Sequence, residues 1–248
     1  MLYGITNHSK TLKHYLLLLI CSLIASTAIA ANNQAINVYL KLKPNNEVNE
    51  LIKEFNQFLE KEKIFMTYQI TPYIDNHPLH VTLFMAHYSQ AQIPKIIREI
   101  AVLAKQQKPV SLLTSRFVPK GGYVKLSVTN DSQIQGLSNK TLMTLAPLRD
   151  KKALVPAWAA RNIERRIIFN QYGSPAVLNY FNPHFSMFSI SHLQKDDIAR
   201  LHQELQQLIA KFAKNHQTQI RVSAVEIGIG IVNQQGQIVK ELKSFTLE

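Results

Sequence analysis

Two short stretches of the sequence each place a histidine beside a hydroxyl. The run His-Val-Thr-Leu begins at His80, and the run His-Phe-Ser-Met begins at His184. Because successive side chains of a β-strand point to opposite faces, His80 shares a face with Thr82, and His184 shares a face with Ser186. Two such strands brought together would gather two imidazoles and two hydroxyls around one point. That set can supply a general acid, a general base and hydrogen-bond donors to an anion.

The repetition makes this pattern informative. A single His-x-Thr run is most often a partly buried histidine at a strand edge. Here the two histidines are 104 residues apart, and each follows a proline by one or two residues. A second copy in a similar context is much less expected by chance, so we interpret His80, Thr82, His184 and Ser186 as one catalytic set.

The paired motifs resemble those of the 2H phosphoesterase superfamily, also described as 2′-5′ RNA ligase-like or cyclic phosphodiesterases. Two His-x-Thr/Ser-apolar motifs define that superfamily, and the resemblance covers most of the chain after about residue 30. Ser186 stands where threonine is commoner, which the superfamily tolerates. The resemblance implies a two-lobed fold, and attack of water or a ribose hydroxyl at phosphorus by paired-histidine acid–base catalysis without a metal.

The periodicity of the first half predicts alternating strands and helices. Alternation over 35–43 predicts a strand, and helical spacing predicts helices over 48–61 and 93–105. Residues 64–70 are apolar and predict a strand or an extended segment. The first motif strand is expected over 79–87, and a hairpin over 110–118 and 122–129.

The second half repeats this order. Helices are expected over 132–145, where Asp131 can cap the start, and over 156–169, where a proline comes first. The second motif strand over 184–190 precedes a helix over 196–215 and a hairpin over 219–232 and 237–247. We therefore predict a duplicated α+β fold within one domain, residues 31–248. Each lobe is an antiparallel sheet with helices on its outer face, and an active-site groove lies between the lobes. The lobes are expected at about 35–130 and 150–248, allowing for strand exchange.

The beginning of the chain has the pattern of a signal peptide. Lys10 and Lys13 precede an apolar run over 16–24, and Ala-Ile-Ala at 28–30 fits a cleavage site, which predicts a mature start near Ala31. The run is short for a membrane span, although an uncleaved anchor is the alternative. Cys21 is the only cysteine, so the mature chain would contain none. We expect export to the periplasm or the medium, with no stable membrane association after cleavage.

The composition favours an anionic partner. The 248 residues are 46% hydrophobic, enough for a substantial core, and the formal net charge is +12. Simple solubility explains such a charge equally well. We expect Arg116, Tyr123, Tyr172 and Tyr180 to bind substrate, since aromatic rings can stack on bases and basic groups can guide phosphate. Ordinary packing is an equal alternative for each aromatic residue.

Other residues with a chemical signature have simpler interpretations. Gly228-Ile229-Gly230 precedes a strand rather than a helix, so it indicates close approach of another group and not a dinucleotide loop. His77, His80 and His87 have no acidic cluster near them in the sequence, so we expect no metal and no cofactor. Lys120, Lys125 and Arg166 are further candidates for guiding phosphate.

Together these features predict an exported monomeric phosphodiesterase. Its expected substrates are 2′,3′-cyclic phosphates, 2′-5′ linkages or short oligonucleotides. Two alternatives from other classes remain: a non-catalytic nucleotide- or RNA-binding protein, and an interaction protein on the same scaffold. Paired imidazoles argue against a pure binder, since binding alone does not require them.

Overall fold

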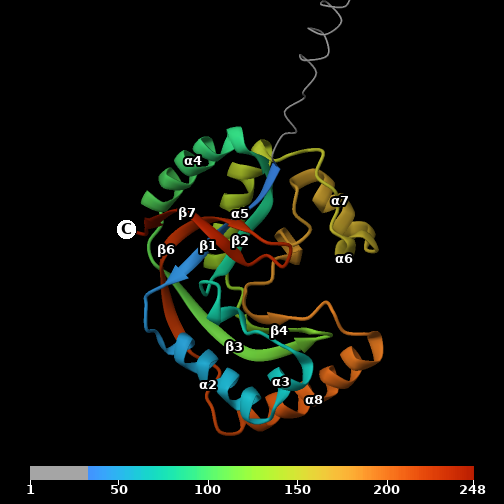
Figure 1. Cartoon of the computed structure of the whole chain (residues 1–248). Coiled ribbons are helices and arrows are strands. Elements are labelled where there is room, and N and C mark those ends of the chain that lie inside the picture. Colours follow the sequence, from blue (N-terminus) through green and yellow to red (C-terminus); the bar gives the residue numbers. More distant parts are fainter. Residues whose placement is uncertain (1–32) are drawn as a thin grey trace, which may run out of the picture. The chain divides into compact units, whose positions relative to one another are not determined.

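A computed structural model describes residues 33–248, of which Gln34–Glu248 form one compact unit. The predicted signal peptide, with its cleavage site near Ala31, lies outside the described residues. Within the described residues, no helix has the length and apolar character that crossing a membrane requires. Seven strands form an antiparallel sheet with helices packed against it, which confirms the predicted α+β class (Figure 1).

One lobe carries the first motif, and we call it the first-motif lobe. Its strands are β1 (Asn33–Leu42), β2 (Val81–Ser89), β7 (Ile238–Thr246) and most of β6 (Arg221–Val232). They lie in the order β2-β1-β6-β7. Helices α4 (Ile93–Lys105) and α5 (Ser132–Leu145) pack on these strands, as Figure 1 shows.

The other lobe carries the second motif, and we call it the second-motif lobe. Its strands are β3 (Val110–Lys120), β4 (Tyr123–Val128) and β5 (His184–Ser189), paired in that order. Helices α2 (Glu47–Lys61) and α8 (Lys195–Ala213) cover the outer side of this lobe, next to the short helix α3 (Ile64–Tyr68) (Figure 1). The core here includes three aromatic rings in mutual contact, those of Phe55, Phe117 and Phe212.

The long strand β6 joins the two lobes. Its first residues, Arg221–Ala224, pair with β3. From Ala224 onward, one edge of β6 pairs with β1. From Glu226 onward, the other edge pairs with β7. Segments from both halves of the chain therefore contribute to each lobe. Helix α2 comes from the first half but packs beside α8, and β6 and β7 come from the second half but pair with β1 and with each other. The predicted sequential lobes, 35–130 and 150–248, thus interleave through strand exchange, which the prediction had allowed.

Two predicted segments differ in the structure. Residues 64–70 contain helix α3 rather than a strand, bounded by Lys63 and Gln69, which both adopt positive φ. The helix predicted over 156–169 is two helices, α6 (Ala157–Ala160) and α7 (Ile163–Tyr172). The break occurs because the Asn162 side chain accepts a hydrogen bond from the amide of Arg165 and caps a new helix there.

The pair of glycines in β6 serves close packing, as predicted. A Cβ on Gly228 would lie 2.4 Å from Cε2 of Tyr39, whose ring is buried against this point of β6. The absence of a side chain at Gly228 is therefore what lets the Tyr39 ring lie flat against the strand.

This contact predicts opposite effects for two glycine substitutions. Gly228→Ala should lower the free energy of unfolding by about 1–3 kcal/mol, because the added methyl overpacks the Tyr39 ring. Gly136→Ala is the matched control: its Cβ would meet nothing within 4 Å inside helix α5, and it should raise stability by about 0.5–1 kcal/mol. Urea unfolding measures both. Equal stability of Gly228→Ala and wild type would show that the ring has room to move.

Candidate active site

The two motif histidines are held in the same way. Nδ1 of His80 lies 3.0 Å from the carbonyl oxygen of Pro78, and Nδ1 of His184 lies 2.6 Å from that of Asn182. A carbonyl oxygen only accepts hydrogen bonds, so each Nδ1 carries the proton and donates it. In both lobes the partner is the residue two positions earlier. In the neutral ring, each Nε2 therefore carries no proton and can accept one.

The two motif hydroxyls are also held by polar neighbours. Nδ2 of Asn37 on β1 donates to Oγ1 of Thr82 over 2.8 Å, and the hydroxyls of Tyr123 and Ser186 lie 2.8 Å apart. Because Thr82 is the acceptor in its bond, its own proton is available to an anion. Asn37 is fully buried and its Oδ1 has no partner among the described residues, so it belongs to the site and not to the apolar core.

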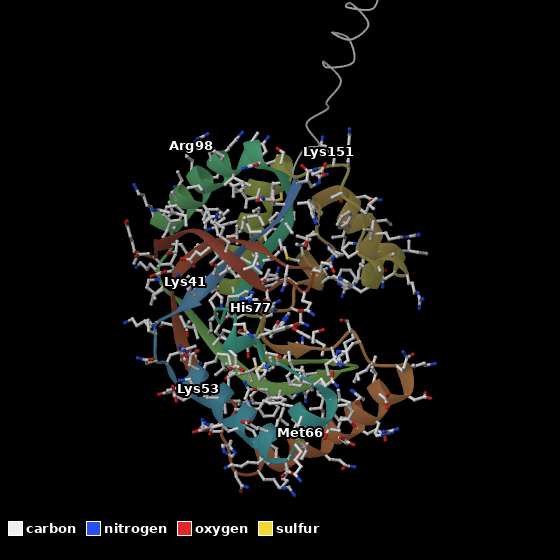
Figure 2. The ribbon with its side chains drawn as sticks, viewed as in Figure 1. Lys41, Lys53, Met66, His77, Arg98 and Lys151 are labelled. Carbon is white, nitrogen blue, oxygen red and sulfur yellow. The ribbon has the colours of Figure 1, made fainter. Side chains whose placement is uncertain are left out.

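Side chains from both motifs meet at one small pocket. His80 and Ser186 line it together, with Tyr73, His77 and Gln237 beside them. Figure 2 shows His77 near the middle of the described unit, where its Nδ1 donates to the carbonyl of Ile238 over 2.9 Å. The structure thus brings one residue of each motif, His80 and Ser186, to one pocket, and Thr82 and His184 lie two residues away from these along the chain.

The surroundings keep both motif imidazoles neutral. Burial lowers the pKa of His80, which is 6% exposed, and the nearby backbone carbonyls of Pro78 and Gly236 oppose that effect. Burial lowers the pKa of His184 to about 4; the carbonyl of Asn182 opposes this effect, and the charge of Lys125 adds to it. An anion bound between the rings would favour their protonated forms again.

A tyrosine ring flanks each imidazole. The Tyr39 ring meets that of His80 edge-on with centroids 5.4 Å apart, and the Tyr123 ring meets that of His184 edge-on at 6.0 Å. Tyr39 is fixed from behind, because its hydroxyl donates to Glu241 over 2.8 Å. Burial raises the pKa of both tyrosines, so both stay neutral. These rings limit how far each imidazole can turn.

The four predicted substrate-binding residues occupy different positions. Tyr123 lies in the site beside Ser186, and Arg116 is exposed on β3, two strands from β5. Tyr172 instead packs against the apolar core, because α7 turns that side of the helix inward. The ring of Tyr180 lies under the guanidinium of Arg165 at 4.3 Å, and its hydroxyl donates to Glu164. Both side chains therefore have contacts within the protein, and their part in substrate binding stays a prediction.

Sequence reasoning missed several groups of the site. Asn37 and Tyr39 lie on β1, Tyr73 lies in a short 3-10 turn, and Gln237 begins the return into β7. The only signal for the first two was a polar and an aromatic residue at alternate positions of an otherwise apolar strand. Within residues 33–248, no group of three histidine, cysteine or acidic side chains is placed to hold a metal ion. Metal independence stays a prediction.

Comparison with solved structures identifies the fold. TT0787 of Thermus thermophilus aligns over 86% of this chain and 97% of its own, with 11% identity and a TM-score of 0.51. Usb1 of Kluyveromyces marxianus aligns over 86% and 98%, with 13% identity and a TM-score of 0.48. LigT of E. coli in complex with 3′-AMP aligns over 87% and 99%, with 13% identity and a TM-score of 0.47. The sequence itself matches no protein-family model and no curated protein.

The likeness to the Thermus protein establishes the fold and not an activity. This chain shares the α+β fold of that protein over most of both chains, in agreement with the fold class that the sequence predicted. The chemistry follows from the site itself.

The low pKa of His184 predicts a pH-dependent stability. The ordinary imidazole value is 6.5, and the folded value is about 4. Above pH 6.5 the ring is neutral in both states; as the pH falls from 6.5 toward 4, only the unfolded chain takes up the proton, so the free energy of unfolding decreases. His184→Asn removes this titration and should lose less stability than wild type between about pH 7 and pH 5. Urea unfolding at both pH values measures the difference. Equal losses would show that the folded protein does not suppress protonation of His184.

Proposed function

We propose that this protein is a metal-independent phosphodiesterase that hydrolyses 2′,3′-cyclic phosphates or short oligonucleotide phosphodiesters. One observation supports the proposal: both motif imidazoles are anchored through Nδ1 to the carbonyl two residues earlier, and a residue of each motif, His80 and Ser186, lines one pocket. A binding protein needs neither the matched tautomers nor the paired placement. Acid–base catalysis at a phosphate needs both.

In the proposed reaction, Nε2 of one imidazole removes a proton from the attacking water. The other imidazole, in its protonated form, donates to the oxygen that leaves phosphorus, so one bond to phosphorus forms as another breaks. Thr82 and Ser186 donate hydrogen bonds to the non-bridging oxygens, where negative charge grows in the transition state. For a cyclic phosphate, the product is a monoester on the same ribose.

The surroundings favour different roles for the two histidines. Lys125 lies close to His184 and disfavours a second positive charge there, which suits a general base. His80 has the carbonyls of Pro78 and Gly236 near its ring, and these favour the protonated form. We therefore propose His184 as the base and His80 as the acid once a phosphate is bound.

Export is part of the proposal. The order of lysines, apolar run and Ala-Ile-Ala at residues 28–30 supports a cleaved signal and a mature start near Ala31. Hydrolysis suits a compartment without ATP better than ligation does. Mass spectrometry of the exported protein tests this, and an intact Met1 would contradict cleavage.

Substitution of the motif residues tests the activity. A general acid and a general base each contribute about 10²–10⁴-fold, so His80→Ala and His184→Ala should each lower kcat for a cyclic nucleotide at least about a hundredfold. Thr82→Ala or Ser186→Ala should cost about tenfold to a few hundredfold. The double histidine variant should cost much less than the product of the singles, because the pair acts as a unit.

The matched control is His202→Ala, which removes an imidazole from helix α8 and should retain wild-type turnover. Activity should also survive EDTA, since no metal takes part in the proposed steps. Wild-type protein that binds nucleotides but turns over no 2′,3′-cyclic nucleotide, 2′-5′ oligoadenylate or cyclic dinucleotide would overturn the proposal in favour of a binding protein.

A further inference from the structure

We propose that one face of strands β3 to β5, the face that carries Ser186 and Tyr123 and that we call the groove face, holds a second phosphate subsite. This subsite is formed by Lys125 and Lys120 and continued by Arg116. This inference rests on the proposed function and narrows its substrate to oligonucleotides that end in the scissile phosphate. Such a substrate places one phosphate between the histidines and the next one over β4 and β3.

The strand register places Lys125 beside the catalytic set. On β4, Lys125 pairs with Ser186 of β5, and Ser127 pairs with His184. Side chains directly opposite each other on neighbouring strands share a face. On the other face of β4, Val124 and Leu126 are fully buried. Lys125 therefore stands on the groove face, next to the Ser186 hydroxyl.

The next strand carries this face further. On β3, Val118 pairs with Lys125 and Lys120 pairs with Tyr123, which contacts Ser186. Strands lie about 4.8 Å apart, so Lys120 starts about 10 Å from β5, across β4. Arg116 is exposed on the same strand, at the irregularity in the β3–β4 pairing between Thr114 and Phe117.

Among the described residues, none of these three cations forms an ion pair with a carboxylate. The ion pairs in this part of the chain involve other basic residues: Lys41, Lys53, Arg200 and Lys211. Lys125 is only partly exposed, and burial, followed by the charge of Lys120, lowers its pKa. Two neighbouring ammonium groups without a counter-ion, one of them half-buried, are electrostatically unfavourable until an anion joins them. A second phosphate over β4 and β3, between Lys125 and Lys120, would supply that anion.

The charges of the first-motif lobe indicate in which direction a bound oligonucleotide would extend from the histidines. Lys41 lies two residues after Tyr39 on β1. Its ammonium group forms ion pairs with Glu226 and Glu241, each at 3.0 Å. Those carboxylates neutralise Lys41 and would repel a phosphate. An oligonucleotide that extends from the histidine pair is thus expected to lie along the second-motif lobe and not along the first-motif lobe.

The test compares two substrates that end in the same 2′,3′-cyclic phosphate, a mononucleotide and a tetranucleotide. Wild type should show a kcat/KM at least about tenfold higher for the tetranucleotide, and this preference should fall as salt is raised, because phosphate contacts release counter-ions. Lys120→Gln and Arg116→Gln should each reduce the preference about three- to tenfold, with the mononucleotide as internal reference. The matched control Lys140→Gln removes a charge from helix α5, away from the groove face, and should retain the preference.

The outcomes separate this inference from the proposed function. Equal kcat/KM for both substrates, or the same loss from Lys140→Gln as from Lys120→Gln, would overturn the subsite and leave the phosphodiesterase intact. If wild type turns over neither substrate, the proposed function fails, and fluorescence anisotropy of a labelled tetranucleotide decides the subsite. Weaker binding by Lys120→Gln and Arg116→Gln but not by Lys140→Gln would support it, and equal binding by all would overturn it.

Discussion

The hydrogen bond from each motif imidazole to the carbonyl two residues earlier is the contact on which the site depends. It fixes the proton on Nδ1, so Nε2 of His80 and of His184 can exchange a proton with a substrate. It also ties the ring to the backbone just before the motif strand, where a proline shapes the approach. Since the same bond occurs in both lobes, the two motifs hold their imidazoles in the same tautomer and in the same local way.

The charged residues nearby differ between the two motif histidines. Both lobes hold a hydroxyl two residues after the histidine and a tyrosine ring edge-on to it, yet their charges differ. Within residues 33–248, Lys125 of the second-motif lobe has no ion pair beside Ser186, whereas Lys41 in the first-motif lobe is neutralised by two glutamates. The two lobes thus hold similar groups in surroundings of different charge. Such a difference suits acid–base catalysis, because one group must give a proton while the other takes one.

Much of the fold was predictable because it follows local patterns. Helical spacing and caps predicted 93–105 and 132–145 as the structure has them, and alternation predicted the motif strands. Five apolar or weakly polar residues at 64–68 carry too little periodicity to separate a strand from helix α3. The break in the predicted helix over 156–169 depends on one side chain, Asn162, which caps α7.

The proposed catalytic residues could be singled out in the sequence because they lie within two repeated motifs, whereas the groups that contact them could not. Asn37 is 45 residues from Thr82 in sequence, and Tyr39 contacts His80 only because Gly228 on β6 makes room. Such contacts depend on which strands pair, and no local sequence pattern indicates that β6 pairs with strands of both lobes. Tyr172 and Tyr180 show the converse: they are near His184 in sequence, yet the contacts of their rings are with the apolar core and with Arg165, and their role in substrate binding stays a prediction.

The central claim is that both imidazoles act on one phosphate, and histidine ¹⁵N NMR during titration with a nucleoside 2′-monophosphate tests it most directly. The account predicts that the Nε2 signals of His80 and His184 shift together with a single dissociation constant, and that His80 takes up a proton in the complex while His184 remains neutral. Assignment through His80→Asn and His184→Asn identifies the two signals. If only one signal responds, or if the two follow different dissociation constants, the imidazoles do not share a phosphate and the account is wrong.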